Sequence, residues 1–277
     1  MVAKKRPVLR LYKSDCIKGM RKHVPDDSVD IVITSPPYNL GVKYNSYEDD
    51  KEWAGFLDWC CEWASEVHRC LKPDGSFFLN VGCSPSAPLF PHMLLHRLSD
   101  EKLEHHFVLQ NTIHWIKSLA VPRNGEEVTI GHIKPINSER FISDGHEFIF
   151  HLTPNGNTKL DRLAVGVPYA DKSNIARWKH TGGSDLKCRG NVWFIPYKTI
   201  QNRAKERPHP ATFPTELAAK CIQLHGKNGS SIVMDPFLGI GHAAFAAIDC
   251  GVAEFVGFEI DGEYLKVAKD EIDQMCH

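Results

Sequence analysis

Residues 29–39 read Val-Asp-Ile-Val-Ile-Thr-Ser-Pro-Pro-Tyr-Asn, a strand-like run that ends in a stiff polar loop. Each of the two prolines, Pro36 and Pro37, fixes its φ angle at about −65° and lacks an N–H donor. The residue before a proline is held extended. The loop therefore forms a rigid rim with the hydroxyl of Ser35, bare carbonyl oxygens and the ring of Tyr38. Such a rim suits a flat ring that bears an amino group, although a simple strand-ending turn has the same composition.

Short apolar strands alternate with helical patterns around this run, which predicts an α/β sheet. The apolar positions of residues 53–71 repeat at helical spacing and make one face. The other predicted elements of this first region are a helix over 16–22, strands over 9–12 and 76–81 on either side of the 29–34 strand, and strand-like runs at 115–117 and 147–152.

A second region with the same alternation runs from about residue 215 to residue 277. Its predicted elements, in chain order, are a helix over 216–225 capped by Thr215, a buried strand over 231–234, a helix over 243–250, a strand over 255–259 and a last helix capped by Asp261. Both regions therefore predict the same α/β architecture.

A glycine-containing loop, residues 235–242, follows the buried strand of the second region and reads Asp-Pro-Phe-Leu-Gly-Ile-Gly-His. Gly239 and Gly241 permit a tight turn and close approach of a ligand to the backbone. Glu259 ends the next strand, where a carboxylate can accept hydrogen bonds from ribose hydroxyls. Ala244 stands where a dinucleotide fingerprint has its third glycine. The loop predicts a single-nucleoside cofactor, and a tight turn beside a surface glutamate is the alternative.

A loop-rich segment separates the two regions. Residues 153–191 have many Pro, Gly, Asn and basic residues and little periodicity, and long loops of this kind are often functional. Residues 172–207 hold nine Lys or Arg and two acids, which fits a local polyanion-binding face, and a solvated loop, the usual role of a charge run, is the alternative. The predicted organisation is a catalytic half over 1–152, a target-recognition insert over 153–191 and a cofactor-binding half over 192–277.

The composition is that of a globular protein. The chain has 277 residues, is 42% hydrophobic and carries a net charge of −1. Nine cysteines lack CxxC spacing, and the histidines lack metal-ligand spacing, so we expect reduced thiols, a cytoplasmic location and no metal. No stretch approaches the roughly 18 apolar residues of a membrane span, so we expect no membrane association.

The loop at 34–38 combined with the loop at 235–241 closely resembles the amino-directed DNA methyltransferases that use S-adenosylmethionine. The order of the two loops resembles the permuted, beta-group arrangement of those enzymes. Further matching segments are 15–16, 25–30, 71–75, 115–117, 146–147, 209–214 and 257–264. The resemblance implies a Rossmann-like methyltransferase sheet, mostly parallel with one antiparallel strand. It departs where the family usually has Gly-Ser-Gly-Thr and this chain has Gly-Ile-Gly-His at 239–242, which bears on cofactor affinity.

The resemblance also implies roles for individual residues. Ser35 and the carbonyl of Pro36 would accept hydrogen bonds from the amino group of a flipped base, next to Pro37, and Tyr38 would stack on its ring. Residues implied to bind S-adenosylmethionine are Asp15, Cys16, Thr34, His209, Phe213, Pro214, Asp235, Pro236, Phe237, Gly239, Gly241 and Glu259.

Ser35 bears on which base is methylated. Family members with serine here mostly act on cytosine N4 and those with aspartate mostly on adenine N6, so we expect cytosine N4 and keep adenine N6 as the alternative. A non-catalytic DNA-binding relative is a third hypothesis. Cytosine-C5 chemistry needs a cysteine after a proline, and the sequence has no Pro-Cys pair.

Double-stranded DNA is the implied partner. Arg177, Lys179, Lys187 and Arg189 of the basic insert are the candidate contacts to phosphates or guanine edges. Residues 41–51 are polar and are expected to close over the DNA. A restriction–modification enzyme is the expected context, with any paired endonuclease acting separately, and both a monomer and a homodimer are compatible with the sequence.

Overall fold

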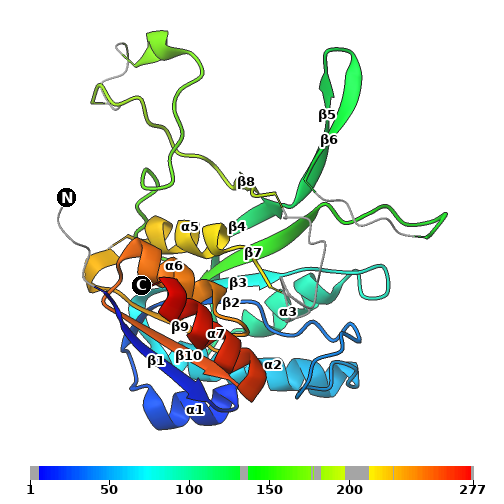
Figure 1. Cartoon of the computed structure of the whole chain (residues 1–277), viewed down its shortest axis with the longest axis vertical. Helices are drawn as coiled ribbons and strands as arrows, with labels where there is room; N and C mark the ends of the chain where they lie inside the picture. The colour runs from blue at the N-terminus through cyan, green and yellow to red at the C-terminus, as the bar shows by residue number, and fades with distance from the viewer. Residues whose placement is uncertain are drawn as a thin grey trace.

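The computed structural model describes residues 6–131, 137–175, 177, 182–196, 212–226 and 228–275. Its centre is an eight-stranded sheet with the strand order β1-β10-β9-β2-β3-β7-β4-β8 (Figure 1). The strands span Val8–Lys13 (β1), Val29–Thr34 (β2), Leu71–Val81 (β3), Val108–Ile116 (β4), His146–Thr153 (β7), Val192–Phe194 (β8), Ile232–Asp235 (β9) and Glu254–Glu259 (β10). Strand β7 pairs antiparallel with β3 and β4, and the other pairings in this sheet are parallel. The predicted fold class is confirmed.

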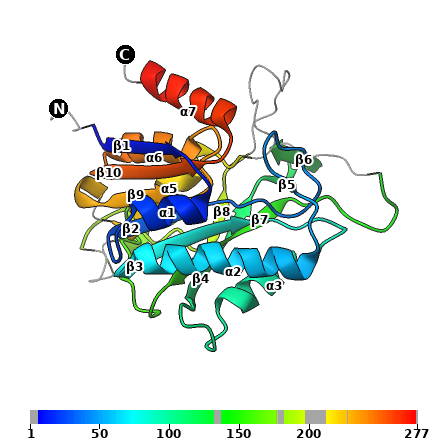
Figure 2. The same ribbon diagram turned by 90° about the horizontal axis from the view of Figure 1, so that it is seen from below.

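Helices cover both faces of the sheet (Figure 2). Those packed on one face are α1 (Cys16–His23), α2 (Trp53–Cys70) and α3 (Phe90–Leu98), and those on the other are α5 (Thr215–His225), α6 (His242–Cys250) and α7 (Gly262–Met275). Successive side chains of a strand point to opposite faces. Accordingly Val32 of β2 joins the first core, whereas Ile31 and Ile33 join the second. This two-sided burial explains why the run at residues 31–33 of β2 is continuously apolar instead of alternating with polar residues.

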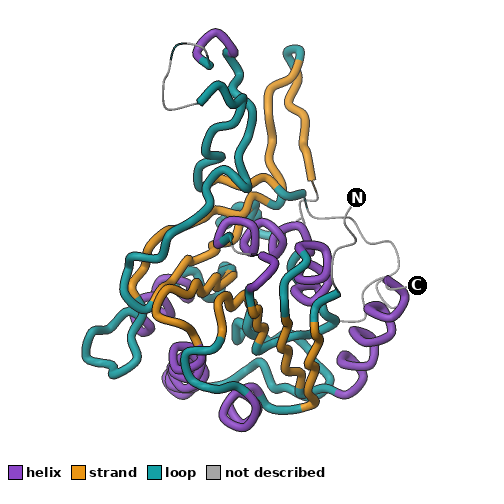
Figure 3. The backbone as a smooth tube through the Cα atoms, turned by 90° about the vertical axis from the view of Figure 1, so that its left-hand side faces the viewer, coloured by secondary structure: helices purple, strands orange, loops and turns teal. Residues whose placement is uncertain are grey.

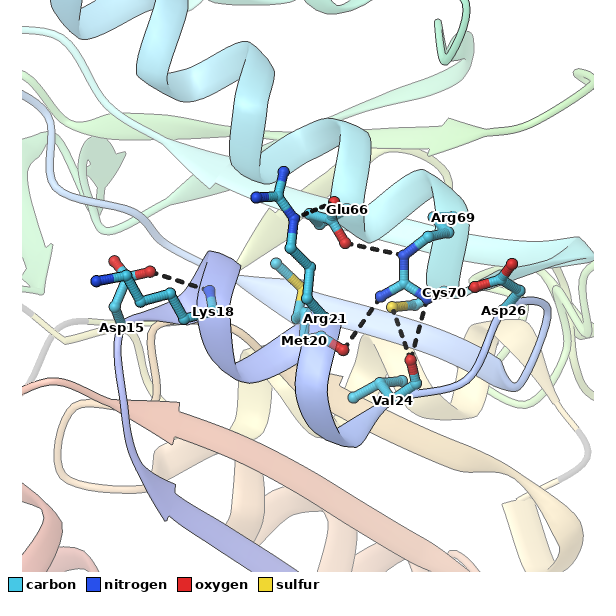
Figure 4. A network of polar contacts seen from close by, with 9 residues as sticks. All are labelled: Asp15, Lys18, Met20, Arg21, Val24, Asp26, Glu66, Arg69 and Cys70. Carbon is cyan, nitrogen blue, oxygen red and sulfur yellow. Dashed lines mark hydrogen bonds and ion pairs between the residues drawn. The ribbon is translucent and has the colours of Figure 1, made fainter.

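An ion-pair cluster fastens α1 to α2 (Figure 4). Glu66 of α2 accepts hydrogen bonds from the Nε atoms of Arg21 and Arg69, each over 2.8 Å. Arg69 also donates to the carbonyl oxygens of Met20 and Val24, each over 3.1 Å. The cluster satisfies backbone carbonyls at the C-terminal end of α1 and holds this helix in place. Because α1 follows β1 directly, the cluster also fixes the loop between them.

The elements differ from the predicted ones in three places. The sequence predicts that residues 72–75 connect the helix over 53–71 to the strand over 76–81, but they lie within β3. Val29 pairs with Leu71 and Ile31 pairs with Ser76, so an irregularity in the pairing absorbs the extra residues. The N-cap of α5 is Pro214 rather than Thr215. Elements that had no sequence prediction are α3, β8 and the hairpin formed by β5 (Ser118–Arg123) and β6 (Glu126–Gly131).

Two segments project from the same side of the molecule (Figures 1 and 3). One is the β5–β6 hairpin, and the other is the middle of the predicted insert, which contains the short 3-10 helix Lys172–Asn174. The first part of the insert packs on the body instead: Val165 is buried in the second core, and the N–H of Asp161 donates to the carbonyl of Leu224 over 2.8 Å. The projecting arm is therefore shorter than residues 153–191.

None of the helices in the described ranges has both the length and the apolar character that a membrane span requires. The cysteines in this part of the chain are free thiols. The described residues also contain no group of three or more His, Cys, Asp or Glu side chains that could hold a metal ion.

Candidate active site

The functional residues meet at one edge of the sheet. The parallel strands β1, β10, β9, β2 and β3 all end there, and the antiparallel strand β7 begins there. Loops that follow the carboxyl ends of parallel strands share one crevice. Here they enclose a cavity of about 680 Å³, lined by residues 35–38 after β2 and by Pro236 and Phe237 after β9. Segments about 200 residues apart in sequence thus form one site.

Thr34 and Asp235 join the two loops from behind the cavity wall. Both residues are buried, and the Thr34 hydroxyl donates to Oδ1 of Asp235 over 2.6 Å. The backbone N–H of Phe237 donates to the same oxygen over 2.9 Å. Burial raises the pKa of Asp235 to about 7, although both hydrogen bonds act to lower it. These hydrogen bonds to Asp235 hold the 34–38 loop and the 235–241 loop in a constant relative position.

Ser35 and Tyr38 of the 34–38 loop are hydrogen-bonded to each other. The Ser35 Oγ atom lies 2.7 Å from the Tyr38 hydroxyl oxygen, and both residues line the cavity. The ring of Tyr38 packs against Phe90 with centroids 5.8 Å apart. The stacking role predicted for Tyr38 stays a prediction, but its hydroxyl already has a clear function, which is to hold Ser35.

A polar network extends from Tyr38 across three strands. The Tyr38 hydroxyl lies 3.1 Å from the carbonyl oxygen of Asn80 on β3 and 3.3 Å from Oε2 of Glu147 on β7. The Asn80 amide nitrogen donates to the Tyr38 oxygen over 2.8 Å and to Glu147 Oε2 over 2.5 Å. Lys117, just after β4, pairs with Glu147 over 3.0 Å. Asn80, Lys117 and Glu147 all line the same cavity as Ser35.

Glu259, the last residue of β10, also lines the cavity. Its Oε2 atom accepts the N–H of Gly239 and its Oε1 atom accepts the N–H of Asp261, each over 2.8 Å. Burial raises the pKa of Glu259, and these backbone hydrogen bonds oppose the rise. Each carboxylate oxygen has two lone pairs. Glu259 can therefore accept further hydrogen bonds from a pair of hydroxyls in the cavity.

The 235–241 loop turns as tightly as its glycines predict. Gly239 and Gly241 have φ angles of 56° and 94°, a region that disfavours other residues. A Cβ atom on Gly241 would also lie 3.1 Å from the side chain of Ala268. Ile240 is 3% exposed, and Nδ1 of His242 lies 2.5 Å from the carbonyl oxygen of Phe213, which lines the cavity. At positions 240 and 242, where the resembled family has the hydroxyls of Ser and Thr, this chain therefore has a buried Ile240 and a His242 that contacts Phe213.

The segment 39–51 forms a strap along the cavity, near Glu259 and Asp261. Asp49 fixes the N-terminal end of the strap, since its carboxylate accepts the N–H groups of Asn39, Leu40 and Val42 over 2.8, 3.1 and 3.0 Å. Ser46 donates to Asp261 over 2.5 Å, next to Glu259. Tyr44, Ser46 and Tyr47 from this strap line the cavity. Through Ser46 the strap contacts Asp261, and the expected closure of residues 41–51 over DNA remains a prediction.

The predicted site residues fall into three groups. Those that line the cavity are Asp15, Cys16, Ser35, Pro36, Pro37, Tyr38, Phe213, Pro236, Phe237 and Glu259. Those of the described chain that support it without lining it are Thr34, Pro214, Asp235, Gly239 and Gly241. His209 and Lys179 lie outside the described residues.

The predicted DNA contacts within the described residues do not line the cavity. These are Arg177, Lys187 and Arg189, all in the insert. The Arg189 Nε atom donates to the carbonyl of Val165 over 2.9 Å, and Lys187 lies 5.8 Å from the centre of the Tyr169 ring. Their contacts with DNA remain a prediction.

Sequence reasoning assigned no role to Asn80, Lys117, Asp144 or Glu147, which also line the cavity. The sequence offered one signal for two of them, because Lys117 and Glu147 stand at the ends of strand-like runs. Asn80 lies inside a predicted strand and carried no signal of its own.

The comparisons with known proteins agree with this geometry. A family model for the N6/N4 DNA methylases matches residues 29–270. The chain belongs to this family. As an N6/N4 DNA methylase it joins enzymes that methylate amino groups of DNA bases with S-adenosylmethionine as the methyl donor. Its relatives include the type II methyltransferase M.HpaI of Haemophilus parainfluenzae, 27% identical over 95% of this chain and 74% of the relative.

Both base specificities occur among the relatives of this DNA methylase. The DNA adenine methyltransferase YhdJ of Escherichia coli is 27% identical over 96% of this chain and 83% of its own. The structure of the cytosine-N4-specific PvuII DNA methyltransferase matches with a TM-score of 0.66 at 20% identity, over 96% of this chain and 88% of that one. The Thermus thermophilus modification methylase TTHA0409, complexed with S-adenosyl-L-methionine, matches with a TM-score of 0.63 at 23% identity, over 96% and 94%. These likenesses support the fold and leave the target base open.

Proposed function

We propose that this DNA methylase transfers a methyl group from S-adenosylmethionine to N4 of cytosine in double-stranded DNA, as a site-specific enzyme of a restriction–modification system. The observation that carries the proposal is the single cavity shared by Ser35 and Glu259. One wall offers a hydroxyl for an amino group, and the other offers a carboxylate for ribose hydroxyls. A nucleoside cofactor and a flipped base therefore meet in one enclosed space.

The cofactor side of the cavity fits S-adenosylmethionine. Glu259 would accept hydrogen bonds from the ribose hydroxyls, while the positive φ angles of Gly239 and Gly241 let the ligand approach the backbone. Pro236 and Phe237 supply apolar wall beside it. When bound, S-adenosylmethionine supplies an electrophilic methyl group on a sulfonium. The volume of about 680 Å³ is enough for the cofactor and part of a base.

The catalytic side would act by positioning. The amino group of a base is a weak nucleophile because its lone pair is delocalised into the ring. Ser35 Oγ and the Pro36 carbonyl would accept its two N–H bonds and turn the lone pair toward the donor methyl group. The reaction forms an N–CH₃ bond, breaks the S–CH₃ bond and releases one amino proton to water. It needs no covalent enzyme intermediate.

Serine at position 35 is the reason to propose cytosine. A hydroxyl both donates and accepts hydrogen bonds, and cytosine presents an acceptor, N3, beside its amino group. Adenine N6 is the second candidate, and the similarity to the adenine methyltransferase YhdJ favours it. The projecting arm and the β5–β6 hairpin stand on the same side of the molecule (Figure 3) and would hold the duplex from which the base is flipped.

The test uses DNA from a bacterial strain that lacks DNA methyltransferases. The protein is incubated with this DNA and S-adenosylmethionine, and the DNA is digested to nucleosides and analysed by mass spectrometry. We expect N4-methylcytosine. If only N6-methyladenine forms, the target base is adenine and the cytosine proposal is wrong. If no methylated nucleoside forms although calorimetry shows that the cofactor binds, the catalytic proposal is refuted. Sequencing that detects modified bases then gives the recognised site.

A further inference from the structure

The direction of one proton decides what Ser35 can do. The Ser35 and Tyr38 hydroxyl oxygens lie 2.7 Å apart, so one of the two groups donates to the other. If Tyr38 donates, a lone pair of Ser35 is used within the protein. If Ser35 donates, its proton points at Tyr38 and its lone pairs face the cavity, free to accept a hydrogen bond from a substrate amino group.

The surroundings of Tyr38 select the second arrangement. Two oxygens that cannot donate lie within reach of the Tyr38 proton: the Asn80 carbonyl at 3.1 Å and the Glu147 carboxylate at 3.3 Å. The Asn80 amide already donates to the Tyr38 oxygen over 2.8 Å. Turning the Tyr38 proton toward Ser35 would leave these two acceptors facing a lone pair. The Tyr38 hydroxyl therefore donates its one proton to one of these two acceptors, and Ser35 donates to Tyr38.

Glu147 is held firmly enough to impose this order. It pairs with Lys117 over 3.0 Å and accepts the Asn80 amide over 2.5 Å, and its side chain is only 17% exposed. Burial, and after it the charge of Glu147, raise the pKa of Tyr38 well above its ordinary range, so Tyr38 keeps its proton and stays a donor.

The side chain of Asn80 has an unsatisfied polar atom, and its role in the network explains why. Its side-chain oxygen is buried and has no hydrogen-bond partner in the described part of the chain. An unsatisfied buried polar atom destabilises a fold and calls for a reason other than stability. The reason here is the amide nitrogen, which bridges Tyr38 and Glu147. Exchanging the amide oxygen and nitrogen would set an oxygen against the carboxylate, so the orientation is determined.

We propose that Glu147 is a positioning residue that acts through Tyr38 and Asn80 to fix the direction of the Ser35 proton, so that the Ser35 oxygen accepts a hydrogen bond from the target amino group. The inference rests on the proposed function of Ser35. In a methylase with serine at this position, a carboxylate then orients the serine oxygen that accepts from the base. In a methylase with aspartate there, the carboxylate would contact the base itself.

The test is a double-mutant cycle with Glu147→Gln and Ser35→Ala. In Glu147→Gln, Lys117 attracts the amide oxygen, which turns the amide nitrogen toward Tyr38 and removes an acceptor. Single-turnover transfer of labelled methyl groups to unmethylated genomic DNA should slow roughly 10- to 100-fold, with cofactor affinity within about twofold of wild type. In the Ser35→Ala background the same change should have almost no further effect, because the residue acts through Ser35.

Two further variants keep the test decisive. Tyr38→Phe keeps the ring against Phe90, removes only the hydroxyl, and should be equally non-additive with Ser35→Ala; it serves if Glu147→Gln fails to fold. Glu66→Gln is the matched control, since Glu66 is also a nearly buried carboxylate paired with basic residues but lies outside the cavity. Its rate per folded molecule should equal that of wild type.

The outcomes separate the two proposals. A wild-type enzyme that transfers methyl groups to DNA supports the proposed function. Given that activity, an unchanged rate in Glu147→Gln would overturn only the role of Glu147. The same conclusion follows if the rate losses of Glu147→Gln and Ser35→Ala multiply in the double variant. A wild-type protein that binds S-adenosylmethionine but methylates no DNA would overturn the proposed function, and the role of Glu147 with it.

Discussion

At the scale of single residues, Ser35 has the most specific environment in the molecule. It lines the cavity, and its hydroxyl has one nearby partner of known position, Tyr38 at 2.7 Å. Its role in orienting an amino group leads to the first prediction. Ser35→Ala should lower the methyl-transfer rate by at least about 100-fold, since a preorganised hydrogen bond at the reacting group is lost.

Cofactor binding by Ser35→Ala should not change, because Ser35 follows β2 whereas Glu259 ends β10, and β9 lies between these two strands. Calorimetry with S-adenosylmethionine checks this. Ser230→Ala is the matched control for both measurements, since Ser230 is exposed just before β9, at the end of that strand away from the cavity. A variant that turns over at the wild-type rate would remove Ser35 from the reaction.

Asp235 supplies a second residue-scale prediction, on stability. Its folded-state pKa of about 7 exceeds its ordinary value of 3.8 because the side chain is buried. Between these two values the folded protein holds a proton that the unfolded chain releases, so the contribution of this group to stability falls as pH rises through this window. Asp235→Asn keeps an acceptor for Thr34 and Phe237 and has no charge to bury.

Asp235→Asn should therefore gain free energy of unfolding relative to wild type between pH 5 and pH 8, on the order of 1–3 kcal/mol. Urea unfolding at several pH values measures the difference between the two proteins. Parallel curves would show that Asp235 ionises normally in the folded state.

The individual residues that carried recognisable chemistry could be found from sequence. Ser35, Pro236 and Glu259 follow strands, and their residue types match the two halves of a transfer site. Asn80 and Glu147 could not be assigned in this way. Their function depends on where β3 and β7 place them relative to Tyr38, and that is a property of strand pairing.

At the scale of elements, the strap of residues 39–51 is the least expected feature. Its three backbone hydrogen bonds to the Asp49 carboxylate fold it back over the cavity, and burial raises the pKa of Asp49 against the lowering effect of these bonds. Asp49→Ala removes all three bonds and should loosen Tyr44, Ser46 and Tyr47 over the cofactor.

The expected result for Asp49→Ala is a roughly 10-fold weaker Kd for S-adenosylmethionine, because a strap that is no longer preorganised must be ordered on binding. The neighbouring Asp50 is exposed, so Asp50→Ala is the control and should bind as wild type does. Equal affinities for the two variants would mean that the strap does not contribute to cofactor binding.

Periodic apolar patterns explain why most elements were predictable. The face of α2 and the two-sided burial of β2 are local in sequence and survive into the fold. The β5–β6 hairpin and β8 were missed, because neither has a strong pattern: β8 has three residues, and it exists only because it pairs with β4. The strand predicted over 76–81 begins too late, because Leu71 already pairs with Val29 of β2 and residues 72–75 are included in β3.

At the scale of the whole molecule, the projecting arm and hairpin stand on one side of the sheet, and the cavity opens at its edge. If the arm holds DNA, its cations release counterions from the phosphates. Replacing Arg177 and Lys187 together by glutamine should reduce the slope of log K against log salt concentration by roughly 2, at about 0.9 for each phosphate contact.

Fluorescence anisotropy with an unmethylated DNA duplex at several salt concentrations measures that slope. The control replaces Lys266 and Lys269, which are exposed on α7, by glutamine and should leave the slope unchanged. The same slope for the arm variant and wild type would place the DNA elsewhere on the surface.

The sequence by itself determined the family, the α/β architecture and the two loops that face each other in the site. These are local signals: strand runs, turn-forming glycines, a Pro-Pro rim and a carboxylate at a strand end. Only the tertiary structure decided how the loops are joined through Thr34 and Asp235, that the strap lines the cavity beside Asp261, and that Glu147 lies next to Tyr38. Each of these depends on contacts between residues far apart in the chain, whose partners are set by strand order and register rather than by any neighbouring residue.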